Sequence, residues 1–273
     1  SLTFGSKLLN GWESVGIKEQ TQIGFGQTLQ YVYYILIKLR FSRCFYYTHT
    51  KKVLHMAKQG KRNTYDRIVD ASLELFNTEG ERKISTNHIA AHLSISPGNL
   101  YYHFRNKDEI ILQLFKRYRS ELSEILNRSE TPKDMNGMID YFLEVFDVMW
   151  RYRFLFADVN TLLMRNSELS GEYQNFTWKQ VSPMVHTHLQ RLIDGGALKG
   201  EVLDIDALAL NIWLICRYWF VFDGSLNNHQ LDEKSKVRGL LQVFNLLRPY
   251  VRDEFMAQYN DGLTVLQHRL EAN

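Results

Sequence analysis

The sequence predicts an all-α protein in which a small N-terminal domain of three helices is followed by a larger helical domain. The prediction rests first on the small number of turn-forming residues. The 273 residues contain 16 Gly but only 4 Pro, which is too few for many short strands joined by tight turns. It rests second on apolar residues that recur at helical spacing through most of the chain from Thr64 onward. Hydrophobic residues make up 45% and charged residues 23%, a globular composition that excludes collagen-like and disordered chains.

The first 55 residues differ from the rest of the chain. They contain no Met and no Asp, are dense in aromatic side chains, and show no sustained period of 3.6 or 2. A basic segment and a capped helix follow Met56 directly. We therefore interpret Met56 as the native start, and residues 1–55 as upstream sequence read in frame or as an artefact of cloning. A genuine extension, or an arm that lies on a membrane surface, is the alternative.

The first helix of the small domain is predicted to start at Thr64, whose hydroxyl can cap it, and to end at Gly80, which supplies a left-handed stop. Polar residues alternate with its apolar face, as in an amphipathic helix. That face consists of Ile68, Val69, Ala71, Leu73, Leu75 and Phe76.

Two shorter helices follow, joined by a tight turn. Ser85 or Thr86 caps the first of them. Ser96 caps the second, and Pro97 fits its first helical position because proline lacks the N–H that would be unpaired there. Two short helices joined in this way form the helix-turn-helix pattern, in which the second helix presents its N-terminal residues to the major groove of DNA.

Residues 84–109 read ISTNHIAAHLSISPGNLYYHFRNKDE. This run resembles the DNA-binding signature of TetR-family transcriptional repressors. The resemblance covers about residues 62–112, and the segment L-Y-Y-H-F-x-N-K is more specific than a generic helix-turn-helix pattern. It implies double-stranded DNA as the partner and a three-helix DNA-binding domain over residues 56–108.

The resemblance also implies particular contacts. Phosphate contacts are expected from Thr86 and Lys107, contacts to backbone or bases from Tyr101, Tyr102 and His103, and base-reading positions at Asn87, Pro97, Gly98 and Asn99. The residue types support this independently, because three consecutive ring side chains on one short helix cannot all face a core. Asn99 is the best candidate for a base edge, since an amide can pair with adenine, whereas Pro97 and Gly98 offer only shape and apolar contact.

Residues 109–273 are predicted to form the larger helical domain for effector binding and dimerisation. One long helix runs from Lys107 to about Asn127 and links the two domains. Further helices are expected as two within 135–164, one at 168–194, one with its apolar core at 208–222, and one over about 232–258 that Pro249 bends.

The resemblance implies a homodimer in which the last two helices of each subunit form a four-helix interface. The helix at 208–222 is apolar nearly all round, and the next helix carries an apolar stripe at Val237, Leu240, Leu241, Phe244 and Leu247. Without a partner these helices would leave a large exposed patch. A dimer also places two recognition helices on a pseudo-palindromic operator.

The helices before the interface are expected to enclose a small, largely apolar effector. Its pocket would be lined by Trp150, Phe154, Met164, Trp178 and Trp213, with Asn160, His186, Asn211 and Arg217 as polar groups that orient the ligand. Large aromatic residues at helical spacing also fit a plain core. Asn211 and Arg217 are stronger candidates, because polar groups inside an apolar helix need partners. Ligand binding would favour a dimer spacing that does not fit DNA and so relieve repression.

Charge separates the two domains. Residues 56–120 contain eleven Lys or Arg against seven Asp or Glu, whereas residues 121–273 contain fifteen against twenty-one. A basic part followed by an acidic part fits nucleic-acid binding by the first and a different task for the second. The alternative function is a ligand-independent DNA-binding or protein-interaction module whose acidic half binds a partner protein.

The sequence predicts no catalytic residue, cofactor or metal site. His88 and His92 have i, i+4 spacing but lack a carboxylate between them, and solvated histidines are the better interpretation. Cys44 and Cys216 have no zinc-ligand spacing and cannot form a disulfide framework, which favours a cytoplasmic protein. No apolar run reaches the roughly 20 residues that span a bilayer, so no membrane partner is expected.

Overall fold

A computed structural model describes residues 63–128, 135–202, 204–227 and 231–271. All described residues belong to one compact unit, which spans residues 63–273. The interpretation of residues 1–55 and of Met56 as the start lies outside these residues. The described residues form helices joined by short turns, with no strand and one isolated bridge between Leu198 and Val251, which confirms the all-α prediction.

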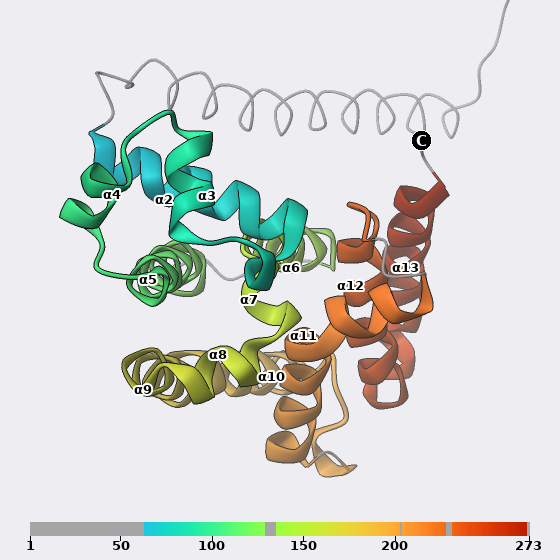
Figure 1. The fold of residues 1–273 in the computed structure, drawn as a ribbon. Coiled ribbons are helices and arrows are strands. Elements are labelled where there is room, and N and C mark those ends of the chain that lie inside the picture. Colours follow the sequence, from blue (N-terminus) through green and yellow to red (C-terminus); the bar gives the residue numbers. More distant parts are fainter. Residues whose placement is uncertain (1–62, 129–134, 203, 228–230, 272–273) are drawn as a thin grey trace, which may run out of the picture. The chain divides into compact units, whose positions relative to one another are not determined.

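Residues 63–106 form the helix-turn-helix part of the molecule (Figure 1). Its elements are α2 (Thr64–Leu75), a π-helical turn η1 (Phe76–Gly80), a 3₁₀ turn η2 (Glu81–Lys83), α3 (Thr86–His92) and α4 (Pro97–His103). The next helix, α5 (Lys107–Leu126), runs across residue 108, where the small domain is predicted to end. The two predicted domains therefore share one continuous helix.

Local capping explains where these helices begin. Asn63 caps α2 by accepting a hydrogen bond from the Asp66 N–H at 2.8 Å, so the cap is one residue earlier than the predicted Thr64. Ser85 and Ser96 cap α3 and α4 by accepting from backbone N–H groups at 3.3 and 3.1 Å. Gly80 has a φ of 88°, the left-handed conformation predicted for it, although the regular α-helix has already ended at Leu75.

Residues 107–271 form the C-terminal part, which begins with α5. Its further helices are α6 (Met135–Arg151), α7 (Phe154–Ala157), α8 (Val159–Arg165), α9 (Ser167–Phe176), α10 (Ser182–Asp194), α11 (Ile205–Leu226), α12 (Ser235–Leu247) and α13 (Met256–Glu271). The predicted helix at 168–194 is divided by a π-helical turn, η3 (Thr177–Val181). The predicted bend at Pro249 is a complete break, because a 3₁₀ turn (Arg248–Tyr250) ends α12 there and α13 starts separately.

Most of the apolar stripe of α12 is buried inside the chain, so this stripe does not leave the exposed patch that was expected of it, and its place in a dimer interface stays a prediction. Val237, Leu240, Phe244 and Leu247 are at most 9% exposed, and α12 packs on α6, α11 and α13. Gly239 permits this contact, because a Cβ there would lie 2.5 Å from the Trp219 ring and 2.7 Å from the Phe146 ring. The outward side of α12 carries polar residues such as Gln242 and Asn245.

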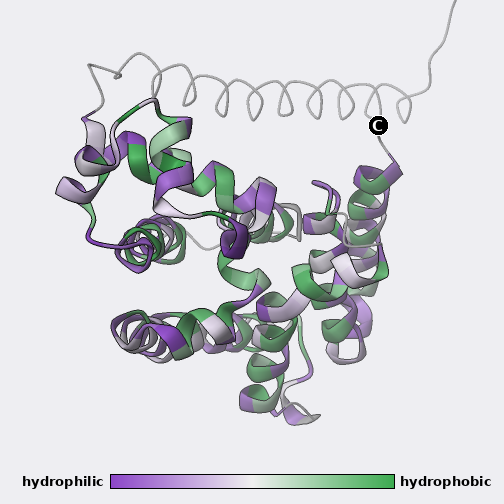
Figure 2. Cartoon of the chain, in the orientation of Figure 1, coloured by the Kyte–Doolittle hydropathy of each residue, from purple (hydrophilic) through white to green (hydrophobic). Residues whose placement is uncertain are grey.

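Helix α11 presents one apolar face to the core and a second to solvent. Leu208, Ile212 and Phe220 are buried, whereas Leu210, Leu214, Tyr218, Val221 and Phe222 are each at least 44% exposed. Figure 2 shows hydrophobic residues along most of α11. By length and composition, its 22 residues are sufficient to cross a membrane, which corrects the expectation that no apolar run is that long. A core helix of a soluble protein has the same composition, so this is weak support for a membrane span.

Candidate DNA-binding surface and interior cavity

Helix α4 exposes the residues predicted to read DNA. Leu100 and Phe104, four positions apart, are 0% and 3% exposed and anchor the helix in the core. Between these two anchors, Tyr101 is 48% and Tyr102 is 85% exposed. Pro97, Gly98 and Asn99 are also exposed, and His103 is half-buried. A Cβ at Gly98 would meet only the Ser96 hydroxyl at 4.0 Å, so the fold does not require a glycine there.

The turn between α3 and α4 fixes how α4 is presented. Ser94 has a φ of 54°, a left-handed conformation that is uncommon for a residue with a side chain. The N–H groups of Ser94 and Ile95 donate at 3.0 Å to carbonyl oxygens of α3, which closes the turn. Tyr65 of α2 then stacks on Phe104 with ring centroids 4.6 Å apart, which holds the end of α4 against α2.

The predicted contacts on α3 and α4 lie beside a basic hollow. The Thr86 hydroxyl and the Tyr101 phenol are 3.0 Å apart and join the two helices, while Asn87 is exposed. The hollow has a volume of about 330 Å³, and its lining includes Lys83, Arg105 and Lys107. Lys83 and the Arg105 side chain, which is 90% exposed, are absent from the predicted contacts. Lys83 lies two residues before Ser85, which caps α3, and Arg105 directly precedes Asn106, which caps α5. These positions next to helix caps were the feature of the sequence that could have indicated both residues.

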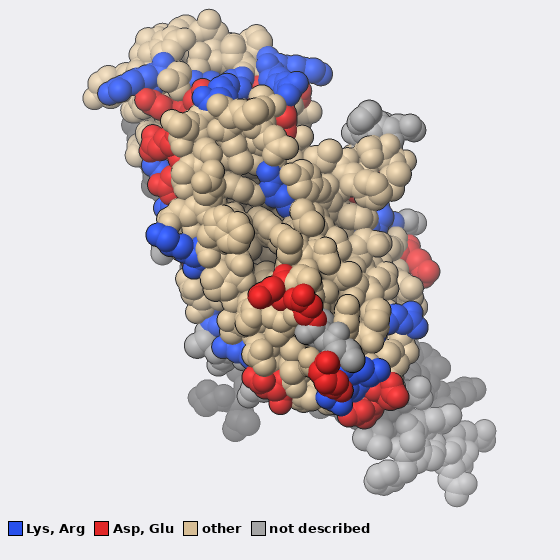
Figure 3. Space-filling model, turned by 90° about the horizontal axis from the view of Figure 1, so that it is seen from below, with Lys and Arg blue, Asp and Glu red and all other residues tan. Residues whose placement is uncertain are grey.

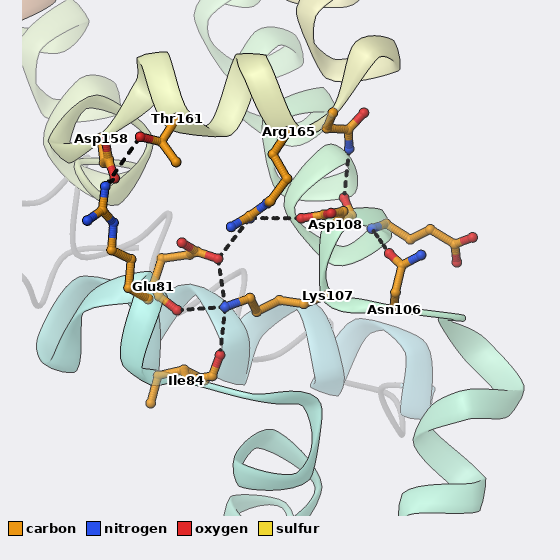
Figure 4. A network of polar contacts seen from close by, with 11 residues as sticks. Glu81, Ile84, Asn106, Lys107, Asp108, Asp158, Thr161 and Arg165 are labelled. Carbon is orange, nitrogen blue, oxygen red and sulfur yellow. Dashed lines mark hydrogen bonds and ion pairs between the residues drawn. The ribbon is translucent and has the colours of Figure 1, made fainter.

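Lys107 is held by the protein itself. Its ammonium donates to the carbonyl oxygens of Glu81 and Ile84 at 2.9 Å each, and it pairs with the Glu81 carboxylate at 2.8 Å (Figure 4). A phosphate contact by Lys107 therefore requires it to give up one of these partners. That contact stays a prediction.

Glu81 and Lys107 belong to a larger group that joins the helix-turn-helix part to α8 (Figure 4). The Arg165 guanidinium lies 2.9 Å from the Glu81 carboxylate and 2.8 Å from the Asp108 carboxylate. Glu81 is 8% exposed, so its pairs are shielded from water. We call these residues the α8 network, which consists of Glu81, Arg82, Lys107, Asp108, Asp158 and Arg165.

Helix α8 also contributes to the wall of a small, partly open apolar cavity. It is lined by Phe115, Tyr118, Leu155, Phe156, Val159, Leu162, Leu163, Leu169 and Tyr173. Its volume of about 10 Å³ is room for roughly one water molecule. Three of its lining residues come from α8, the same helix that carries Arg165.

None of the nine predicted ligand residues lines this cavity, although two of them lie together beside it. Arg217 is 5% exposed, and its Nη2 donates to the Asn160 side-chain oxygen at 3.5 Å. The Arg217 Cζ is 5.2 Å from the ring centroid of Tyr173, a cavity residue that was not among those predicted. Tyr173 lies on the polar helix α9, so nothing in its local sequence distinguished it.

The other predicted ligand residues are dispersed. Met164 and Trp178 are 81% and 70% exposed, so they lie on the surface rather than in the cavity. Phe154 packs on Phe76 at 5.2 Å, and Trp150 lies on Phe220 at 5.6 Å. Asn211 is exposed, His186 is 3.8 Å from the Asp206 carboxylate, and Trp213 is half-buried. Helical spacing places aromatic residues on one face of a helix, but it does not show which of these faces pack together around a common cavity.

His88 has a structural role. Its Nδ1 accepts from the Ser85 N–H at 3.4 Å while the Ser85 hydroxyl accepts from the His88 N–H, a reciprocal cap at the start of α3. Within the ranges that the structure describes, no three His, Cys, Asp or Glu side chains gather as metal ligands.

An exposed second helix on a helix-turn-helix, joined to a larger helical part, defines a helix-turn-helix transcription regulator. Residues 68–114 match the family model of bacterial regulatory proteins of the tetR family, and residues 117–259 match a model described as bacterial transcriptional repressor. The chain belongs to the TetR family of bacterial transcriptional repressors, and its function is regulation rather than catalysis.

Individual relatives agree with the family. The chain is 24% identical over 190 residues to the biofilm operon icaADBC negative transcriptional regulator IcaR of Staphylococcus epidermidis, covering 68% of this chain and 98% of IcaR. It is 36% identical to a TetR-family transcriptional regulator from Marinobacter aquaeolei VT8, with a TM-score of 0.68 over 75% of this chain and 98% of the other. A gamma-butyrolactone receptor shares the fold at 16% identity, with a TM-score of 0.53 over 75% of this chain and 96% of the other.

Proposed function

We propose that this regulator is a homodimeric repressor that leaves a pseudo-palindromic operator when a small, largely apolar ligand enters the cavity beside α8. It acts in the cytoplasm, where bacterial DNA lies. The observation that carries this proposal is the double role of α8. One side of the helix forms the cavity wall through Val159, Leu162 and Leu163, and Arg165 at its end holds Glu81 and Asp108.

Operator reading is assigned to α4 and α3. Asn99, Gly98 and Pro97 lie at the exposed start of α4, the position from which a recognition helix meets base edges. Thr86, Tyr101 and Tyr102 are hydroxyl donors at the same surface, which suits contacts to phosphate oxygens. Lys83 and Arg105 add positive charge that attracts the DNA backbone.

Dimerisation is assigned to the exposed face of α11 rather than to the stripe of α12. Leu210, Leu214, Tyr218 and Phe222 follow one another at four-residue spacing and form a continuous apolar face. In Figure 3, charged side chains are concentrated toward the two ends of the face shown, and mostly uncharged side chains, with a few charged ones among them, lie between. A surface of this kind on a protein from a dimeric family supports an isologous contact between two copies.

The ligand response follows from the small volume of the cavity. A ligand larger than one water molecule fits only if the wall moves, and α8 is the wall element tied to the helix-turn-helix part. A shift of α8 changes the ion pairs at Glu81 and Asp108, and with them the position of the start of α5. The spacing of the two recognition helices in the dimer then changes, so ligand and operator favour different states.

Selection of bound sequences from a random DNA library by the full 273-residue chain tests this function. We expect enrichment of a short inverted repeat bound by two protomers, and loss of binding when a pool of small apolar compounds is added. Arg165→Met should bind the selected DNA but respond more weakly to the compounds. Binding that depends on salt concentration but not on DNA sequence would favour a DNA-organising module. A protein that copurifies in stoichiometric amount, with no response to the compounds, would favour a partner-binding module.

A further inference from the structure

Arg217 is a buried cation to which the fold gives no negative partner. Its residue is 5% exposed, its Nη1 has no hydrogen-bond partner, and its Nη2 reaches only the Asn160 amide oxygen at 3.5 Å. The other buried charged residue of α11, Asp223, does have a partner of opposite charge. Asp223, which is 2% exposed, receives two hydrogen bonds from Arg238 at 2.8 and 2.6 Å. The fold therefore neutralises one buried charge of α11 and leaves the other unmatched.

The ionisable groups near Arg217 do not supply the missing charge. Burial raises the pKa of the Cys216 thiol to about 12, so it stays protonated. Burial also raises the pKa of the Tyr118 phenol, and that of the Tyr173 phenol although the positive charge of Arg217 opposes the rise. Within the described residues, no carboxylate pairs with this guanidinium.

Two buried hydroxyl groups lie on the segment that contacts Arg217, and neither has a partner within ordinary hydrogen-bond geometry, although weak hydrogen bonds from Thr177 and Arg217 act to lower the pKa of the Tyr173 phenol. They are the Tyr173 phenol and the Thr177 hydroxyl, one helical turn further along the same segment. The aromatic ring of Tyr173 lies 5.2 Å from the Arg217 Cζ. The guanidinium can only donate hydrogen bonds, whereas the phenol and the hydroxyl can donate or accept them, and none of the three supplies a negative charge. A carboxylate supplies two oxygens and the single negative charge that Arg217 requires.

Tyr173 also forms part of the wall of the apolar cavity. The cavity continues from it along Phe115, Leu162 and Leu169, side chains that offer only apolar contact. A ligand that satisfied the three donors would therefore place the remainder of its structure among apolar walls. A neutral apolar molecule would fill the cavity but leave the positive charge buried without a partner.

We propose that the effector is an apolar monocarboxylate, with its carboxylate on Arg217, Tyr173 and Thr177 and its hydrocarbon portion in the cavity beside α8. This inference deepens the proposed function and rests on it for one step, the movement of α8 that releases DNA. Binding of the carboxylate itself does not depend on that step.

Straight-chain carboxylic acids of 6 to 14 carbons and the alcohols of equal length are the probes, used below the concentrations at which they form micelles. The melting temperature of the full chain reports binding, because a ligand that binds the folded state raises it. We expect the acid of best-fitting length to act at a concentration about tenfold or more below that of its alcohol, as charge-assisted hydrogen bonds predict. Arg217→Met should remove this preference, whereas Arg248→Met, a change of an exposed arginine, should retain it.

Three results would overturn the proposal: no acid of the series raises the melting temperature, acids and alcohols act alike, or Arg217→Met keeps the preference. Arg217→Gln serves as a second variant, and the comparison of acid with alcohol on the unaltered protein needs no variant. Operator affinity measured in the same samples separates the two proposals. If acids bind without releasing DNA, the carboxylate site is supported and the ligand-released repressor is contradicted. If only an unrelated compound releases DNA, the ligand-released repressor is supported and the carboxylate site is contradicted.

Discussion

The helix-turn-helix part and the C-terminal part differ in where they keep the polar groups that folding does not use. In the first, Asn99 and Tyr102 are exposed, so water satisfies their polar groups when no other molecule is bound. In the second, Arg217, Tyr173 and Thr177 keep polar atoms that are buried without partners. A surface site therefore costs the fold little, whereas an interior site carries a standing penalty that only a ligand removes.

The two parts also differ in how they meet other molecules. In the proposed function, the helix-turn-helix part contacts DNA with small and hydroxyl-bearing residues on α4, whereas the C-terminal part contacts a second copy of the chain through the apolar face of α11. The α8 network connects these two parts, because its ion pairs join α8 to both η2 and α5. Single substitutions can therefore change one part of the molecule and leave the other intact.

The largest effect is expected from Leu214→Glu, which places a charge in the exposed apolar face of α11. The dimer should dissociate, and operator affinity should fall by about 100-fold or more, because a monomer loses the second half-site. Light scattering during size-exclusion chromatography and fluorescence anisotropy on operator DNA measure the two effects. Gln242→Glu, on the outward side of α12, is the matched control and should remain dimeric.

Arg238→Met should lower the free energy of unfolding by about 3 kcal/mol, because it leaves the buried Asp223 carboxylate without its partner. Burial acts to raise the pKa of Asp223, but the hydrogen bonds and charge of Arg238 outweigh it and hold that pKa below its usual range. The stabilisation from this pair is therefore complete above the unfolded pKa of about 3.9, and it is lost as pH falls through the lower folded value.

Chemical denaturation between pH 2.5 and 7 measures this contribution. Asp223→Asn should flatten the acidic limb of the stability curve, whereas Asp206→Asn, a change of an exposed carboxylate on the same helix, should leave it unchanged. A limb that keeps its slope in Asp223→Asn would show that other carboxylates control the acid response.

Sequence reasoning succeeds in the helix-turn-helix part because its determinants are local. Ser85, Ser96 and Pro97 each act within three residues of their own position, so the order of residues reveals their roles. Lys107 is the exception. Its three oxygen partners lie 23 and 26 residues earlier in the chain, and no local pattern indicates that the protein rather than DNA occupies it.

The C-terminal part could be predicted only in outline, because its determinants are contacts between distant helices. The apolar pattern of α12 was correct, but only packing decides that α6 and α13 cover it instead of a second subunit. Arg217 was predicted as a ligand residue because it is a polar group inside an apolar helix, and Asn160 was predicted as another polar group that orients the ligand. Tyr173 and Thr177 were missed, since their lack of partners appears only once α9 and α11 are packed together.

A pair of glycines gives a smaller but opposed test. Gly98→Ala adds a methyl group in open space, so the protein should gain about 0.5 kcal/mol in stability while operator affinity falls by about tenfold. Gly239→Ala should do the opposite, since its Cβ overlaps the Trp219 and Phe146 rings and destabilises the fold by about 2 kcal/mol. Thermal unfolding and anisotropy measure both variants. A Gly98→Ala protein with unaltered operator affinity would remove this residue from the DNA surface.

Whether the exposed start of α4 reads base pairs is tested most directly by comparing Asn99→Ala with Tyr102→Ala. Both variants are measured on the selected operator and on a set of operators in which each base pair is changed in turn. We expect Asn99→Ala to lose discrimination at one base pair, worth about 1–3 kcal/mol, with an unchanged dependence on salt. Tyr102→Ala should weaken binding to every sequence by a similar factor. Equal affinities for the parent and both variants across the whole set would contradict the assignment of α4 as the recognition helix.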